Sequence, residues 1–354
     1  MKIYIQGTGN ISPQQTYGSV PFLAEPVEFT GNRLTCLEPV YKEIIDIKLI
    51  RRMSRIIKMG VAAATQCLKE AGVEVPDAIV TGTAYGCLED TGVFLTKLIE
   101  TDEEVYSPTA FIQSTHNTVG GQIALMLQCT KYNNTFAHRG GSFESALLDA
   151  IMLLEEDEAE NVLVGGIDEI TDISHAILSR MGLYKREAVS NLELFNSDSK
   201  GTIAGEGASF FLLGNKPSTN DYAVLDAMTT FYKPVDQAET EQHILSFLAE
   251  QSISINDIDL VITGKNGDTK NDRVFTQLQT SIFKNNACIN YKHLCGEYPT
   301  AVSFALWMGA NIIKTSTIPD AVNEDHKGDN QLKRILIYNH YQNIYYSLIL
   351  ISAC

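Results

Sequence analysis

The segment from Thr130 to Glu156, "TKYNNTFAHRGGSFESALLDAIMLLEE", combines a strand, a glycine turn and a helix. Strand-forming residues run from Tyr132 to Ala137, the pair Gly140-Gly141 makes a sharp turn, and a helix begins at Ser142. Many enzymes that transfer acyl groups carry their nucleophile at such a strand-to-helix turn. This turn contains no cysteine, so the first question is which group could do chemistry there.

Ser142 is the only hydroxyl at the turn and has two interpretations. In the first it is a substitute nucleophile, with His138 or His116 as its general base. In the second it is the N-cap of the helix that follows, where serine is favoured and where Glu144 suits the first turn. We prefer the cap, because nothing in the sequence fixes a base beside the hydroxyl.

The composition limits the partners of the chain. Its 354 residues are enough for two domains or one large α/β unit, and 44% of them are hydrophobic, so a sizeable core can form. The formal net charge of −16 argues against nucleic acid and against an anionic membrane surface, because both attract basic proteins.

The cysteines and the N-terminal sequence indicate a cytoplasmic protein. Seven cysteines are scattered without CxxC spacing, which fits neither a disulfide framework nor a zinc site. The opening "MKIYIQGTGNIS" lacks the apolar core of a signal peptide, and no apolar run approaches transmembrane length. The stretches "GTGN" and "TGTAYG" match no dinucleotide or P-loop fingerprint, so we expect no cofactor and no metal.

The order of apolar segments predicts an α/β fold. A long helical segment covers residues 46–72, is rich in small residues in its second part, and ends at Gly72, a plausible C-terminal cap. Apolar β-branched runs predict strands that are mostly buried on both faces, as in a sheet covered by helices, at residues 2–7, 77–86, 161–168, 208–214, 259–267 and 334–339.

A weak internal repeat suggests two related halves. Residues 77–99 and residues 259–282 both give a buried strand, a Thr-Gly turn, a polar loop with an acidic residue and an amphipathic helix. The segment 214–222, "GNKPSTNDY", has the composition of a linker. We therefore predict an N-terminal half at 1–215 and a shortened C-terminal half at 220–354.

Four stretches, taken in order, resemble the β-ketoacyl synthases. "YIQGTGNISP" resembles their opening strand, "RRMSRIIKMGVAAATQCLKEAGV" the next helix, "DAIMLLEEDEAENVLVGGIDE" the helix and strand after the nucleophile, and "GTIAGEGASFFLLG" a later strand. The resemblance implies the thiolase-like fold, in which two duplicated halves stack in five layers, α-β-α-β-α, and the protein is normally a dimer. That expectation agrees with the internal repeat.

The resemblance also implies that the catalytic side chains of the family are missing. Working ketosynthases use a cysteine at the elbow and two histidines, and these positions correspond here to Gly140, Gly264 and Glu297. The Asn-Asp pair of the first histidine motif is kept as residues 271–272. The glycine-rich loop expected near the C-terminus reads "NHYQNIYYS", residues 339–347, without glycine.

The second histidine motif allows another alignment. A shift of four residues would place His293 at the histidine position, next to Cys295, but would lose the match of Lys292 and Gly296. If Glu297 does occupy that buried position, its carboxyl needs a cation or a donor. We predict an ion pair with a nearby base; the candidates are Lys292, Lys265 and Arg139.

A basic run stands out in this acidic chain, formed by Lys48, Arg51, Arg52, Arg55 and Lys58. In similar synthases, basic residues at this place help to dock the acidic acyl carrier protein, and Lys48, Arg51 and Arg52 are the candidates here. The alternative is a solvated face, or one neutralised by residues 155–160 or by a partner subunit.

These observations support three hypotheses. The first is a catalytically inactive subunit resembling a chain length factor, which pairs as a heterodimer with an active ketosynthase in type II fatty acid or polyketide synthesis, with aryl polyene synthesis as one such pathway. The second is an acyltransferase or condensing enzyme that uses Ser142 with His138 or His116, or acts through Glu297. The third is a homodimer that binds acyl or coenzyme A thioesters without catalysis.

Overall fold

The computed structural model describes residues 1–354 except 19–20, 105–107, 197 and 323–331. Its strands are β1 Ile3–Ile11, β2 Thr30–Gly31, β3 Ala78–Gly82, β4 Tyr132–Phe136, β5 Asn161–Asp168, β6 Val189–Ser190, β7 Gly207–Gly214, β8 Ala223–Tyr232, β9 Leu260–Thr263, β10 Ala287–Asn290, β11 Arg334–Tyr341 and β12 Tyr345–Ser352. Its helices are α1 Ile47–Ile50, α2 Arg55–Ala71, α3 Leu88–Glu100, α4 Pro108–Gln113, α5 Thr118–Leu127, α6 Ser142–Glu155, α7 Asp172–Arg180, α8 Gln237–Glu250, α9 Arg273–Thr280, α10 Lys292–Cys295 and α11 Val302–Thr315.

The main sheet consists of two five-stranded parts with the same topology. The strand order is β10-β9-β11-β12-β8-β1-β7-β5-β3-β4, and β1 and β8 meet only where Ile3–Ile5 pairs with Ala223–Leu225. When the strands of each part are numbered in chain order, both parts have the order 3-2-4-5-1. Strands 3, 2 and 4 pair in parallel, and the pairs 4-5 and 5-1 are antiparallel. The limits given above for the halves, 1–215 and 220–354, stay a prediction.

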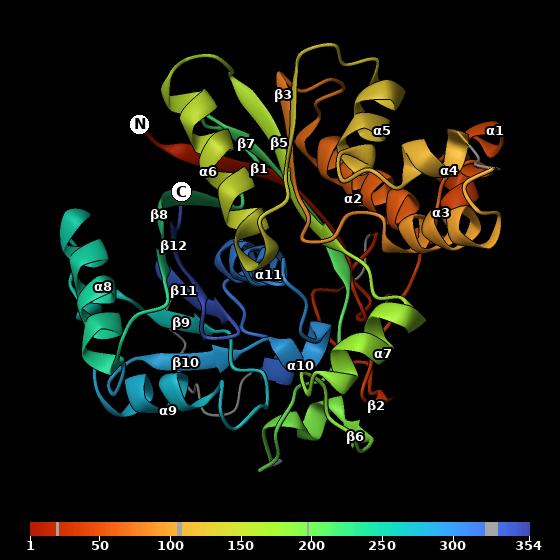
Figure 1. Ribbon diagram of the computed structural model, residues 1–354. Coiled ribbons are helices and arrows are strands. Elements are labelled where there is room, and N and C mark those ends of the chain that lie inside the picture. The colour runs from red at the N-terminus through yellow and green to blue at the C-terminus, as the bar shows by residue number, and fades with distance from the viewer. Residues whose placement is uncertain (19–20, 105–107, 197, 323–331) are drawn as a thin grey trace.

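The helices form three layers around the two parts of the sheet (Figure 1). α2 and α5 cover the outer face of the N-terminal part, and α8 and α9 cover the outer face of the C-terminal part. α6 and α11 fill the space between the two parts, so the fold is the mixed α/β arrangement in five layers that the sequence predicts. No helix in the described part of the chain is long and apolar enough to cross a membrane.

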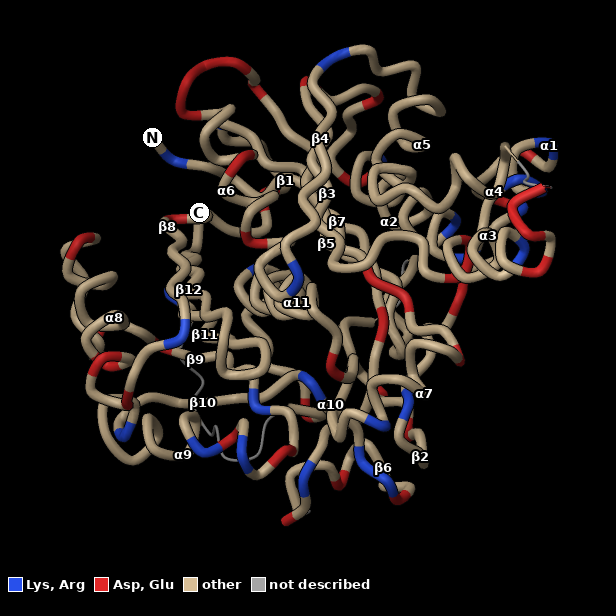
Figure 2. The backbone as a smooth tube through the Cα atoms, viewed as in Figure 1, with Lys and Arg blue, Asp and Glu red and all other residues tan. Residues whose placement is uncertain are grey.

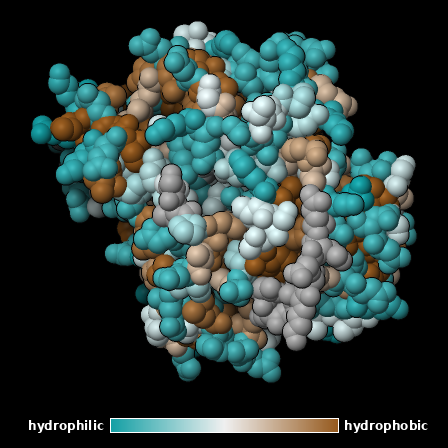
Figure 3. Space-filling model, turned by 180° about the vertical axis from the view of Figure 1, so that it is seen from behind, coloured by the Kyte–Doolittle hydropathy of each residue, from teal (hydrophilic) through white to brown (hydrophobic). Residues whose placement is uncertain are grey.

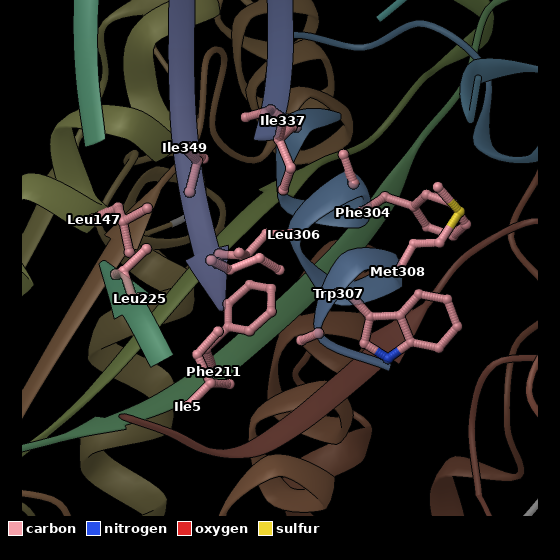
Figure 4. Close-up of a cluster of buried hydrophobic side chains, with 14 of the residues drawn as sticks. Ile5, Leu147, Phe211, Leu225, Phe304, Leu306, Trp307, Met308, Ile337 and Ile349 are labelled. Atoms are coloured by element: carbon pink, nitrogen blue, oxygen red, sulfur yellow. The ribbon is translucent and has the colours of Figure 1, made fainter. Parts of the chain in front are cut away.

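The central layer forms the main core (Figure 4). α11 is buried along nearly its whole length and contacts strands of both parts of the sheet. Side chains of α11, among them Phe304, Leu306, Trp307 and Met308, pack with residues of β1, β7, β11 and β12. The strand residues include Ile5, Phe211, Ile337 and Ile349. Burial of this many large apolar side chains is the main force that holds the two parts together.

Two glycines of β1 let α2 pack directly onto the strand. A Cβ on Gly9 would lie 1.9 Å from the carbonyl oxygen of Ala63, and one on Gly7 would lie 2.5 Å from that of Cys67. This close approach explains the small residues of α2. Gly72 ends the helix in the left-handed conformation, with φ of 68°, as expected for its C-terminal cap.

Candidate functional site

The three positions that match the missing catalytic residues meet at the end of β11. Gly140 lies against Tyr341, Gly264 lies against Asn339, and the ion pair that holds Glu297 reaches the carbonyl oxygen of the intervening residue, His340. Segments that are far apart in the sequence are therefore brought together at three consecutive residues. The candidate site is therefore formed by the fold, and the side chains that fill it decide which chemistry is possible there.

The elbow position has no room for a side chain. Gly140 lies in a short 3-10 turn, Arg139–Gly141, and is buried. A Cβ added to Gly140 would lie 2.5 Å from Cβ of Tyr341 and 2.6 Å from its Cδ1, closer than real Cβ contacts. The ring of Tyr341 therefore occupies the space into which a nucleophile at the elbow would project.

Tyr341 is buried beside a very small cavity. Burial, together with the neighbouring Tyr85 hydroxyl, raises the pKa of Tyr341, so the phenol keeps its proton. The cavity beside it has a volume of only about 20 Å³ and is also lined by Tyr184 and Tyr298. A space of this size holds about one water molecule, so an acyl chain cannot enter it without movement of these rings.

Glu297 forms the ion pair that the sequence predicts. The Lys292 Nζ atom lies 2.9 Å from Glu297 Oε2 and 3.0 Å from Oε1, and both residues are buried. Asn266 Nδ2 also donates to Oε2, at 2.6 Å. The other two candidates are not the partner: Lys265 lies over the ring of Phe195, and Arg139 is exposed. The carboxylate is neutralised by these contacts, so it is not a free base.

The position of the first histidine is also filled. A Cβ on Gly264 would lie 2.1 Å from Oδ1 of Asn339, an atom that accepts a hydrogen bond from the Tyr291 hydroxyl at 3.0 Å. The Asn271-Asp272 pair, which is kept from the first histidine motif, accepts hydrogen bonds that hold its neighbours in place. Asp272 accepts bonds from the amides of residues 266 and 267, both at 2.7 Å, and Asn271 receives one from the imidazole of His340.

His340 is a site residue that sequence reasoning missed. Its Nε2 atom donates to the Asn271 carbonyl oxygen at 3.1 Å, and its Nδ1 atom accepts from the amide of Asn343 at 3.3 Å. Burial, followed by the nearby charge of Lys292, lowers the pKa of His340 to about 3. Both ring nitrogens are therefore engaged and the ring is neutral. A histidine directly after the apolar run Ile335–Tyr338 and Asn339 was the available signal.

The hydroxyl of Ser142 is bound to the backbone. It donates to the carbonyl oxygen of Arg139 at 2.7 Å and accepts from the amide of His138 at 2.8 Å, and the residue is fully buried. The N-cap of α6 is Gly141, so the expectation that Ser142 caps the helix is wrong; the serine closes the preceding turn instead. Within the described residues, no imidazole is among the partners of this hydroxyl, so the geometry gives a nucleophilic role no support.

The other histidines named above lie apart from the elbow hydroxyl. His138 is exposed, with its ring edge-on to that of Tyr345, and His116 is exposed beside Gly86. His293 in α10 contacts the Ala321 carbonyl oxygen at 2.8 Å through Nε2, and burial lowers its pKa to about 4. None of the three is a partner of Ser142 or Glu297 among the described contacts.

The cysteines and acidic groups form no metal centre within the described residues. The seven cysteines are all free, and five of them are buried. Burial raises the pKa of the thiols of Cys36, Cys67 and Cys295 well above its usual value, so they stay protonated.

The basic run divides into two parts. Arg55 binds Glu206 and Glu38, so it belongs to the structure. Lys48, Arg51 and Arg52 are exposed around α1, where Figure 2 shows basic residues gathered. The acidic run at residues 155–160 lies on the far side of the molecule in the same view, so it does not neutralise them.

Comparison with known proteins agrees with this fold. Residues 37–182 match the family model described as the N-terminal domain of β-ketoacyl synthase. No curated protein matches the sequence.

Solved structures match over the whole length of the chain. The ishigamide ketosynthase/chain length factor superimposes with a TM-score of 0.83 at 16% identity, covering 100% of this chain and 99% of that chain. The complex AntDE:AntF, a type II acyl carrier protein with its ketosynthase, gives 0.75 at 15%, with 100% and 99% covered. The ketosynthase ApeO with its chain length factor ApeC from Xenorhabdus doucetiae gives 0.74 at 15%, with 100% and 98% covered.

The family match and the solved structures agree on the fold of this chain. The chain has the complete thiolase-like fold, and the matched segment includes α2, the elbow and α6. Its segment 37–182 is similar to the N-terminal domain of β-ketoacyl synthase, and its elbow is closed by Tyr341.

Proposed function

We propose that the chain is a non-catalytic, chain-length-factor-like subunit that pairs with an active β-ketoacyl synthase in type II fatty acid or polyketide synthesis. The observation that carries the proposal is the filled elbow, where Tyr341 leaves no space for a side chain at Gly140. A condensing enzyme needs an accessible thiol and donors for the developing oxyanion. A subunit that only shapes a shared acyl pocket across the interface needs neither. Aryl polyene synthesis is the pathway that we would test first.

The free edge of the N-terminal sheet is the surface that we assign to the synthase partner. Among the strands that the structure describes, β4 ends the sheet and pairs only with β3, so its other edge offers backbone groups to a second sheet. Large apolar side chains are exposed around it on α5, β4 and α6, at Leu125, Tyr132, Leu148 and Met152. An apolar surface next to an unpaired edge is typical of an interface.

The exposed basic residues of α1 are the surface that we assign to an acyl carrier protein. Lys48, Arg51 and Arg52 lie beside two exposed apolar side chains, Ile47 and Leu49. A basic patch with apolar residues suits an acidic partner, because charge brings the partner in and apolar contact holds it. Further apolar side chains are exposed on α3 and α4. Figure 3, which shows the molecule from behind, has brown patches on that side.

The first experiment tests catalysis. The protein is incubated with acyl thioesters, and its intact mass is compared with that of an authentic ketosynthase treated in the same way. We expect no adduct on this chain while the control is acylated. A stable adduct that maps to Ser142 or to a cysteine would show that the chain is an enzyme and would end the proposal.

The second experiment tests the partner. The chain is mixed with active type II ketosynthases, and the complexes are measured by size-exclusion chromatography with light scattering. We expect a heterodimer that L148E weakens. L245E, which places the same charge on an exposed leucine of α8, is the control and should pair normally. A stable homodimer that no ketosynthase displaces would favour the acyl-thioester binder instead.

A further inference from the structure

The turn between β11 and β12 carries Tyr341 into the elbow. Tyr341 ends β11, and its carbonyl oxygen accepts a hydrogen bond from the amide of Ile344 at 3.1 Å, which closes a tight turn. The two central residues, Gln342 and Asn343, have φ of 56° and 53°. Hairpin turns of this kind need positive φ at both central positions, which glycine and asparagine adopt most easily. The conformation therefore needs support from the surrounding fold.

Asn343 supplies that support through three hydrogen bonds. Its Nδ2 atom donates to Oδ1 of Asn271 at 3.0 Å, and its Oδ1 atom accepts from the hydroxyl of Tyr346 at 3.2 Å. Its backbone amide donates to Nδ1 of His340 at 3.3 Å. The neighbouring Gln342 makes no hydrogen bond through its side chain to any described residue. The side-chain support of the turn therefore comes from Asn343.

The other end of these contacts is fixed as well. Asn271 lies in the loop after β9, where its amide donates to Oδ1 of Asp268 at 3.0 Å and its carbonyl oxygen accepts from Nε2 of His340 at 3.1 Å. The bond between the two asparagines joins residues 72 positions apart in the sequence. The hairpin turn is thus tied to a separate loop of the C-terminal half. We call this group the turn clamp; its members are Asn271, His340, Asn343 and Tyr346.

The turn that faces Tyr341 is held in a similar way. Arg139, directly before Gly140, has φ of 48°, again without glycine. The hydroxyl of Ser142 bonds the carbonyl oxygen of Arg139 and the amide of His138. The contact between Tyr341 and Gly140 therefore joins two turns that are each fixed by hydrogen bonds. Positive-φ residues without glycine persist where the surroundings determine the conformation, and they gather at functional sites.

We propose that Asn343 is a positioning residue that holds Tyr341 in the elbow, so that the ring closes it permanently. Without the side chain of Asn343 the turn loses its bonds to Asn271 and Tyr346, and the ring leaves Gly140 for part of the time. The clamp keeps acyl groups out of this elbow, so an acyl chain stays with the partner synthase. This role rests on the proposed function, whereas the clamp itself uses residues of this chain alone.

The first test measures how often Tyr341 reaches solvent. N343G removes the side-chain bonds and keeps a residue that adopts positive φ without strain. Q342G makes the same backbone change one position earlier and leaves the clamp intact. Hydroxyl-radical footprinting with peptide mass spectrometry gives the oxidation rate of Tyr341, which is 7% exposed in the wild type. We expect a rise of roughly threefold or more in N343G, because two hydrogen bonds are lost, and none in Q342G.

Trp307, which is buried in the central core, is the internal reference for global unfolding. Its oxidation rate should be the same in N343G and in the wild type. An unchanged rate for Tyr341, or an equal rise for Tyr341 and Trp307, would overturn the proposal. N271A breaks the same bond from the other side and keeps the carbonyl oxygen that accepts from His340, so it should also raise the rate at Tyr341 alone.

The second test is a double-variant cycle with G140A. In the wild type, a methyl group at Gly140 meets a ring that cannot move. In N343G the ring can yield, so G140A should lower the urea midpoint by roughly half as much or less. In Q342G it should lower the midpoint as it does in the wild type. Additive effects of G140A and N343G would show that Asn343 stabilises the turn without holding Tyr341, and would overturn the proposal.

Failure of this inference can be told from failure of the proposed function. Both tests use the chain by itself, whereas pairing is measured by light scattering with active ketosynthases. If the clamp variants behave like the wild type while the heterodimer forms, only the role of Asn343 is wrong. If the clamp variants behave as expected and no heterodimer forms, the subunit role is wrong and the clamp remains.

Discussion

The Nζ atom of Lys292 lies 2.9 Å from Oε2 of Glu297, and both side chains are almost completely buried. In this chain a buried ion pair stands where the resemblance places a catalytic histidine. The pair also joins two regions of the fold, because Glu297 bridges to Ala204 through the backbone and Lys292 reaches the His340 carbonyl oxygen.

Removing one member of this pair should destabilise the protein strongly. K292M and E297Q each leave a buried group without its partner, and such changes cost about 3–5 kcal/mol. The double variant K292M/E297L removes both charges and should recover much of that loss. Urea unfolding followed by circular dichroism measures all three. Equal stability of the single and double variants would mean that the charges do not act as a pair.

Gly140 should tolerate no side chain while Tyr341 is present. G140A forces Tyr341 or the turn to move, and overpacking of this kind costs about 1–3 kcal/mol. G121A is the matched control: a Cβ there meets no atom within 4 Å, and Gly121 is inside α5. The control should gain about 0.5–1 kcal/mol, because alanine is the better helix former. Equal effects of the two variants would show that the elbow is not tightly packed.

Glu144 should make the protein less stable as the pH rises. Burial raises the pKa of this carboxyl from 4.5 to about 7 in the folded state, so the folded state binds the proton more tightly than the unfolded chain. The contribution of the Glu144 carboxyl to the stability of the fold is therefore fully present below pH 4.5 and is lost as the pH rises to about 7. E144Q should match the wild type near pH 4.5 and exceed its stability at pH 8 by up to about 3 kcal/mol. Thermal unfolding at the two pH values tests this, and a lower stability of E144Q at pH 8 would contradict it.

The exposed basic residues of α1 should control binding of a carrier protein. The triple variant K48E/R51E/R52E is expected to lower the affinity for an acidic acyl carrier protein by roughly tenfold or more at low salt, with a smaller effect at high salt. The control K233E/K270E/K284E makes the same change in charge at exposed lysines of the C-terminal half. Surface plasmon resonance at two salt concentrations separates them. Equal losses would indicate only a general effect of net charge.

Several local features were readable from the sequence because they depend on neighbouring residues. The helix that ends at Gly72, the buried strands and the turn at Gly140 were predicted and are present. The helical segment predicted at 46–72 is not continuous, because residues 51–54 separate α1 from α2. Of the main sheet, β8, β10 and β12 were missed. β12 begins inside residues 339–347, which the sequence analysis assigned to a loop. It pairs with β11 and with β8, and the residues of β8 lie more than a hundred positions earlier in the chain. The role of Ser142 was wrong for a different reason. Its partners, the His138 amide and the Arg139 carbonyl oxygen, are local, but the residue types alone do not show that the turn directs the hydroxyl at them.

The sequence by itself determined the family resemblance and the residue types at Gly140, Gly264 and Glu297. These are properties of the order of residues along the chain. Only the tertiary structure decided that Tyr341 fills the elbow, that Lys292 rather than Lys265 holds Glu297, and that the carboxyl of Glu144 is buried. The physical reason is packing, because side chains two hundred residues apart compete for the same volume, and that competition appears only when the two halves of the sheet have closed on α6 and α11.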